Sequence, residues 1–355
     1  MLHPIAATLL LLALATAHAQ EWTGPLPPAD APDAQKASPG GSLAWIGRIE
    51  GLARPTRLAA SPDGRWVAVA SGRKLAVHDA RTGAPTGRVE DQPADVAILA
   101  FSPTSTRLVA ACVDGVVAVF RVPDGSLERE LARHDGWHSG GSSAAVAVEM
   151  SPYNLAISSD GTRLFSGNPD GTISRWDLEG GLEEVHRFGA EGPVAAIALD
   201  PADQWLAASV KGKVFVVPAG GGAVLRSFEG GFLPVTHLAV SHDGAWIALD
   251  DIQVSEVRVH ASATGKRTAK LEPRRTGGGD GSRGFGLSGD FEWADDGHLF
   301  TAIFARGGWL LSEWNTRGDP VDSIPLPGEA RDLDVQERRI WVAAGDEVRL
   351  YGRLR

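Results

Sequence analysis

The first candidates for chemistry are three polar side chains within five residues, namely His134, Asp135 and His138 in the stretch RHDGWHSGG. Imidazole and carboxylate groups bind transition metals, but a His-x-x-x-His pair presents both rings on one side only when the segment is helical. The glycines around this pair disfavour a helix, so the sequence predicts no metal site here. Trp137, which lies between the two histidines, has the rigid amphipathic surface that protein interfaces favour. The alternative for Trp137 is a structural role inside the protein.

Three arginines in a second glycine-rich stretch, EPRRTGGGDGSRGFGLSGD, form a local positive patch. The chain as a whole has a net charge of −10 at pH 7, so such a patch suits a carboxylate-bearing or acidic partner. A solvated loop is the alternative. The predicted partner-binding residues of the two stretches are His134, Asp135, Trp137, His138, Arg274, Arg275 and Arg283.

The rest of the sequence lacks the residue patterns that enzymes commonly use. It contains no P-loop, no Gly-x-Ser-x-Gly elbow and no cysteine cluster for zinc or haem. The glycine runs at 219–223 and 277–281 lack a following helical pattern or lysine, so we expect turns rather than phosphate-binding loops. The single cysteine, Cys112, lies in the apolar stretch RLVAACVDG and is expected to be a buried small side chain. The sequence therefore predicts no catalytic residue, no cofactor and no metal.

The N-terminal region differs in composition from the remainder. Residues 1–19 carry no charged side chain, and an apolar run is followed by the small-x-small motif Ala17-His18-Ala19. We interpret this segment as a signal peptide cleaved after Ala19. Residues 20–41, rich in Pro, Ala and Gly, are interpreted as a flexible linker. No later apolar stretch approaches the roughly 20 residues of a membrane-spanning helix, and the acidic charge disfavours binding to nucleic acid.

Residues 42–355 contain seven imperfect copies of one pattern, such as RLAASPDGRWVAVAS and HLAVSHDGAWIALDD. Each copy predicts a short strand, a tight turn, a second strand, another turn and two further strands. Four of the six intervals between copies are 41 or 42 residues, and the other two are 56 and 53. One such four-stranded unit cannot bury both of its faces, so the units must stack. We expect the first strand of each copy to end just before Ser61, Ser102, Ser158, Asp200, Ser241, Ala294 or Gln336.

Most acidic and aromatic side chains in the copies recur at equivalent positions, which indicates a structural role. An active site is rarely copied into every repeat, so we expect the turn carboxylates beside glycine to stabilise the turns. These carboxylates are Asp63, Asp160, Asp243 and Asp296. Tryptophans at equal offsets in the second strands are expected to pack between units. These tryptophans are Trp66, Trp205, Trp246 and Trp341.

The period, the SPDG turn and the dipeptide Trp176-Asp177 resemble the WD-repeat β-propeller family. The resemblance covers about residues 43 to 353, but the motifs are degenerate, because only this copy carries the Trp-Asp pair. It implies an all-β fold, a seven-bladed β-propeller of four-stranded antiparallel blades. Ser166, Asp170 and Trp176 match three members of the hydrogen-bond network of the family, whereas no histidine stands at the fourth place. We therefore expect an incomplete network.

The sequence predicts two further features of the ring, one from the segment before the first copy and one from the two long intervals between copies. The stretch AWIGRIEG, residues 44 to 51, resembles the fourth strands of the copies and is expected to complete the C-terminal blade. The two long intervals each enlarge a link from an outer strand to the inner strand of the next blade. All links of this class emerge on one face of a propeller, where loops commonly carry function.

These expectations favour a non-enzymatic, monomeric interaction module that binds a protein or peptide on that face. The alternative is a propeller that holds a small molecule or metal in the central channel, possibly a hydrolase, although we identify no set of inward-pointing acidic residues in the sequence. The composition, rich in Ala, Arg and Gly, favours a bacterial source. The signal peptide then predicts a periplasmic or secreted protein.

Overall fold

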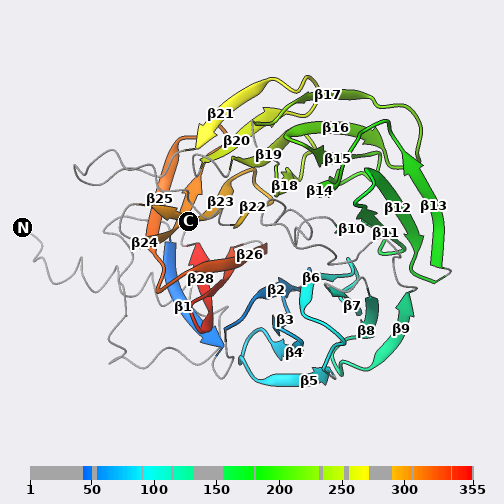
Figure 1. The fold of residues 1–355 in the computed structure, drawn as a ribbon. Helices are drawn as coiled ribbons and strands as arrows, with labels where there is room; N and C mark the ends of the chain where they lie inside the picture. The colour runs from blue at the N-terminus through cyan, green and yellow to red at the C-terminus, as the bar shows by residue number, and fades with distance from the viewer. Residues whose placement is uncertain are drawn as a thin grey trace, which may run out of the picture.

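A computed structural model describes residues 43–49, 54–89, 91–112, 116–131, 155–179, 181–231, 235–251, 256–271, 290–305, 308–336 and 338–353. All of the elements within these ranges are β-strands, and they form seven four-stranded antiparallel sheets. The sheets stand around a ring as the blades of a β-propeller, as Figure 1 shows from one end of the ring axis. The predicted fold is confirmed.

Each blade consists of four strands in chain order, from the inner strand next to the ring axis to the outer strand. Blade 1 contains β2 (Arg57–Ala60), β3 (Trp66–Ser71), β4 (Lys74–Asp79) and β5 (Pro85–Val89). Blade 2 contains β6 (Val96–Phe101), β7 (Arg107–Cys112), β8 (Val117–Arg121) and β9 (Leu127–Leu131). Blade 3 contains β10 (Leu155–Ile157), β11 (Arg163–Gly167), β12 (Thr172–Asp177) and β13 (Gly181–Arg187). Blade 4 contains β14 (Val194–Leu199), β15 (Trp205–Val210), β16 (Lys213–Pro218) and β17 (Arg226–Glu229).

The remaining blades follow the same order, except that the last is completed from the N-terminal side. Blade 5 contains β18 (Leu238–Val240), β19 (Trp246–Asp251), β20 (Glu256–Ala261) and β21 (Arg267–Leu271). Blade 6 contains β22 (Asp290–Trp293), β23 (Leu299–Ala305), β24 (Gly308–Trp314) and β25 (Pro320–Pro325). Blade 7 contains β26 (Ala330–Gln336), β27 (Arg339–Ala344), β28 (Glu347–Arg353) and β1 (Leu43–Ile49).

The pairing of β1 with β28 closes the ring. The two strands are antiparallel, with Leu43 opposite Arg353 and Ile49 opposite Val348. Leu43 and Ile49 are fully buried, so the N-terminal strand contributes to the core as well as to the sheet. The predicted closure is therefore confirmed over Leu43–Ile49, whereas residues 50 and 51 of the predicted strand lie outside the described residues.

The core lies between the blades because every sheet packs both of its faces on its neighbours. Cys112 is buried in an apolar cluster that joins blades 1 and 2, as expected. Trp66, Trp205 and Trp246 each begin a second strand and pack at the edge of such a cluster. Trp341 also packs between blades, but it is the third residue of β27, so its predicted equivalence to the other tryptophans is wrong. The cause is a shorter turn in blade 7, where Gln336 pairs directly with Arg339.

The repeated Asp-Gly turns are held by their own side chains. The Asp63 carboxylate accepts hydrogen bonds from the Ser61 hydroxyl at 2.6 Å and from the Arg65 amide at 3.1 Å. Asp160 and Asp243 bond their turns in the same way. In the Ser158 turn these bonds lower the pKa of Asp160 to about 2. The carboxylates thus have the structural role that their recurrence predicts.

Each of the three residues that match the family network makes a side-chain hydrogen bond in blade 3. The indole of Trp176 donates to the Ser166 hydroxyl at 2.9 Å. Asp170 instead accepts bonds from the Thr172 amide and hydroxyl, at 3.1 and 2.5 Å. The side-chain amide of Asn168 donates to the Thr172 hydroxyl at 2.7 Å and so ties this turn to the blade interior. In blade 6 the indole of Trp314 donates to the Thr301 hydroxyl at 2.9 Å, a second indole–hydroxyl bond that the sequence comparison missed.

Candidate functional site

The inner strands of the seven blades surround a cavity of about 650 Å³ at the centre of the ring. Its wall is mostly aliphatic on the side of blades 2 to 4, where Leu99, Ile157 and Leu199 line it. On the side of blades 6 and 7 it is lined by carboxyl groups instead. The cavity therefore has one apolar and one acidic wall.

The acidic wall comes from alternate residues of two neighbouring inner strands. Asp290 and Glu292 lie on β22, and Asp332 and Asp334 lie on β26. The expectation that the chain has no identifiable inward-pointing acidic set is therefore wrong. The signal was present in the sequence, because DFEW and DLDV place acids at period two where the other copies have mainly small or apolar residues.

Each of these carboxyls bonds the inner strand of the next blade. Asp290 accepts from the Leu333 amide at 2.6 Å, and Glu292 accepts from the Val335 amide at 2.7 Å. Asp332 accepts from the Leu58 amide at 2.6 Å in blade 1, and Asp334 from the Ala60 amide at 2.9 Å. An inner strand is an edge strand, so its channel-side amides have no partner within their own sheet. The acids of blade 6 supply partners for two such amides of blade 7, and the acids of blade 7 supply partners for two amides of blade 1.

The four carboxyls are close enough to perturb one another. Burial raises the pKa of Asp290 well above its ordinary value, and the neighbouring Asp332, to which it is hydrogen-bonded through its side chain, raises it further. Burial and the nearby Asp334 raise the pKa of Glu292 well above its ordinary value. Burial raises the pKa of Asp332, against the effect of the Arg57 guanidinium, and raises the pKa of Asp334 to about 6. Burial therefore favours the protonated form of these carboxyls.

A histidine and a further carboxyl connect this wall to blade 5. The His237 Nδ1 atom lies 3.1 Å from a carboxyl oxygen of Asp290, and its ring stacks on Phe291 with 3.9 Å between centroids. Burial lowers the pKa of His237 well below its ordinary value, so this imidazole is neutral. Behind it, Asp250 accepts from the Thr236 and His237 amides at 2.8 and 3.0 Å, and burial raises the pKa of Asp250 to about 6.

The arrangement is suited to joining blades and holding protons. Within the described residues no group of three or more His, Cys, Asp or Glu side chains is arranged to hold a metal ion. One oxygen of each channel carboxyl is already bonded by a backbone amide of the next blade. These bonds extend without interruption from blade 6 through blade 7 to blade 1.

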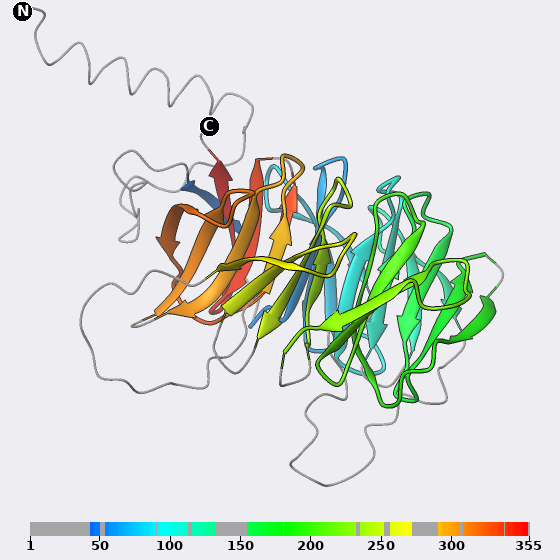
Figure 2. The same ribbon diagram turned by 90° about the horizontal axis from the view of Figure 1, so that it is seen from above.

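The seven predicted partner-binding residues lie outside the described residues. They fall in the two connections from β9 to β10 and from β21 to β22, which end at Leu155 and Asp290. Both connections lead from an outer strand to the inner strand of the next blade, as the sequence predicts. The strands of every blade alternate in direction, so all links of this class leave the ring at the same face; Figure 2 shows the blades from the side.

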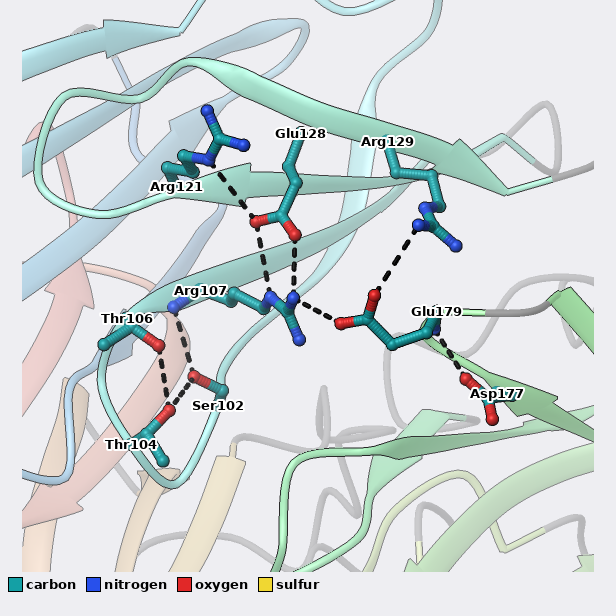
Figure 3. Close-up of polar contacts among 9 residues, drawn as sticks. All are labelled: Ser102, Thr104, Thr106, Arg107, Arg121, Glu128, Arg129, Asp177 and Glu179. Atoms are coloured by element: carbon teal, nitrogen blue, oxygen red, sulfur yellow. Dashed lines mark hydrogen bonds and ion pairs between the residues drawn. The ribbon is translucent and has the colours of Figure 1, made fainter.

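A network of ion pairs on the opposite rim joins blades 2 and 3 (Figure 3). The Arg107 guanidinium bonds Glu128 of β9 at 2.8 Å and Glu179, which follows β12, at 2.5 Å. Arg129 lies 3.7 Å from the second carboxylate oxygen of Glu179. These groups are partly exposed, so we expect each pair to contribute at most about 1 kcal/mol. The network is a structural link between blades that the repeat pattern did not reveal.

Comparison with known proteins supports the repeat assignment. The family described as WD domain, G-beta repeat matches residues 147–177, a range that ends at the Trp176-Asp177 dipeptide. Protein groucho of Drosophila melanogaster is 29% identical over 157 residues, which is 42% of this chain and 19% of groucho. The match thus spans about a fifth of the length of that relative. Among the described residues no helix has the length and apolarity required to cross a membrane.

Proposed function

We propose that this chain, which belongs to the WD-repeat β-propeller family, is a non-enzymatic interaction module that works outside the cytoplasm. WD repeats and the likeness to groucho indicate a scaffold for protein–protein interaction. The finer proposal is that a protein or peptide binds on the face where the outer-to-inner connections emerge. Export is proposed from the apolar N-terminal segment and its Ala17-His18-Ala19 motif.

The observation that carries the proposal is the position of the two connections that interrupt the repeat. They join β9 to β10 and β21 to β22, so both belong to one face of the ring. Short connections of the same class elsewhere, such as Phe188 to Pro193 between β13 and β14, only turn the chain into the next blade. Additional residues on one face of a rigid scaffold are typical of a binding surface.

The test is affinity capture with the full chain and two triple variants. Replacing Trp137, Arg274 and Arg275 by alanine should reduce capture of the native partner at least tenfold without changing the thermal unfolding midpoint, since one anchoring aromatic and two cations commonly contribute 1.4 kcal/mol or more, that is, about tenfold. The matched control replaces Leu127, Arg81 and Arg317, one exposed apolar residue and two exposed arginines at turns of the opposite face. Equal capture by the two variants would contradict the proposal.

A small-molecule or metal site in the channel, possibly that of a hydrolase, is the second candidate. The central cavity with its acidic wall is the observation that favours it. Elemental analysis and native mass spectrometry of the purified chain separate the two candidates. One tightly held metal or organic ligand per chain would place the channel site first.

A further inference from the structure

The seam between blades 6 and 7 brings together two buried carboxyl residues, because the Asp290 carboxyl accepts at 2.6 Å from the Leu333 amide, which directly follows Asp332. We propose that these two groups form a proton-sharing pair that locks blade 6, blade 7 and blade 1 together at low pH and loosens this part of the ring when the proton is lost. The inference concerns the ring itself and does not depend on the identity of a partner.

A hydrogen bond between the Asp290 and Asp332 carboxyls requires a proton on one of them. Two ionised carboxylates cannot hydrogen-bond each other, since neither has a donor. Asp290 and Asp332 are 3% and 7% exposed, so water cannot screen a second charge effectively. With one proton, the pair carries a single negative charge, and the protonated carboxyl donates a hydrogen bond to the ionised one.

The same carboxyls also hold the backbone of the next two blades. Asp290 accepts from Leu333 of blade 7, and Asp332 accepts from Leu58 of blade 1, both at 2.6 Å. Repulsion between two ionised groups would push these side chains apart and lengthen both amide bonds. Loss of one proton therefore affects two seams at once.

The surrounding groups provide a counter-charge for one carboxylate only. The titratable and charged groups that face the pair from blades 5, 6, 7 and 1 are His237, Asp250, Glu292, Asp334 and Arg57. The imidazole of His237 is neutral, and three of the others are acids. Arg57 beside Asp332 is the cation of this set, and it is also bonded to the carbonyls of Ala97 and Thr56 at 2.5 Å. One negative charge is thus balanced, and a second is not.

The direction of the pH effect follows from the position of the proton. The folded chain keeps a proton on the pair at a pH where the unfolded chain, with ordinary Asp side chains, has released it. Raising the pH therefore favours the unfolded chain, from the ordinary Asp value of 3.8 upward through the raised pKa of Asp290. The stabilisation is present in acid and is lost as the pH rises.

The experiment compares the full chain with Asp290→Asn, because an amide can accept from Leu333 and donate to Asp332 without titrating. Thermal unfolding midpoints are measured from about pH 5 to about pH 8, and we expect the midpoint of D290N to decline less steeply than that of the wild type, with the remaining decline coming from Glu292, Asp334 and Asp250. Asp243→Asn, at an exposed turn where the Ser241 bond lowers the pKa of Asp243, is the control and should keep the wild-type slope. Equal slopes in wild type and D290N would overturn the proposal.

A second measurement decides the question if D290N does not fold. The infrared absorption of protonated carboxyl groups is recorded on the wild-type chain at about pH 7, together with hydrogen exchange at the Leu333 and Leu58 amides. We expect a protonated carboxyl signal, and an exchange rate at both amides that rises with pH more steeply than at the Val109 amide, which lies in β7, a strand paired on both sides within blade 2. Absence of the protonated signal, or equal pH dependence at all three amides, would overturn the proposal.

Discussion

Replacing Ile49 by alanine tests whether the N-terminal strand holds the ring closed. Ile49 is the last residue of β1, is 1% exposed, and packs with Leu58 of blade 1 and Trp341 of blade 7. Removing its buried carbons costs both their transfer free energy and the cavity that they leave, and such changes typically cost 2–5 kcal/mol. We expect the free energy of unfolding to fall by about 3 kcal/mol. The backbone of β1 stays paired to β28, so the surrounding residues cannot move in fully to fill the cavity.

The assay is equilibrium unfolding in guanidinium chloride together with thermal unfolding of the full chain. For a domain of this size, about 3 kcal/mol corresponds to a fall in the midpoint of roughly 6 °C. Ile46→Ala on the same strand is the matched control, because Ile46 is only partly buried at the edge of the same cluster and should cost clearly less. If Ile49→Ala costs no more than Ile46→Ala, the seam does not depend on β1 and the argument for closure is wrong.

Two further substitutions test the turns and hydrogen bonds inside the blades. Trp176→Phe removes the donor to the buried Ser166 hydroxyl and should lower the free energy of unfolding by about 1–3 kcal/mol, measured by chemical denaturation. Gly171→Ala should cost more than about 1 kcal/mol, since this glycine has a φ of +81° and an added Cβ would lie 2.6 Å from the Ala190 carbonyl oxygen. The control Gly345→Ala, with a φ of +62° and no atom within 4 Å, should cost less in the same assay, and equal losses would show that crowding by Ala190 has no effect.

Most of the ring could be predicted from the sequence because its signals are local. An alternating apolar strand followed by Asp-Gly determines a hairpin within about ten residues, and Asp63 and Asp160 hold their turns as this pattern predicts. The wrong alignment of Trp341 with the other tryptophans shows where counting residues from the first strand fails. The turn between β26 and β27 is shorter than in the other blades, so an equal count from the first strand leads to a different position in the second.

The acidic wall could not be predicted from the sequence because the hydrogen-bond partners of its carboxyls lie on other blades. Asp290 and Asp332 are 42 residues apart, and each is bonded by an amide of another blade. A carboxylate on a buried strand is unfavourable until the facing edge of the next strand supplies donors. Only the ring geometry shows that edge, so the alternating acids of DFEW and DLDV had no partner that could be identified from the sequence. The two long connections, in contrast, were located correctly, because their length appears directly as a break in the period.

The way blade 7 is assembled gives a reason for the position of the four channel carboxyls at its two seams. It is the blade assembled from both ends of the chain, with β1 pairing to β28 about 300 residues away. Joining such distant segments carries a large entropic cost of loop closure. The same blade is held on one side by Asp290 and Glu292 and on the other by its own Asp332 and Asp334. The polar bonds thus reinforce the two seams on either side of the closing blade, and protonation of the pair at this position affects closure of the whole ring.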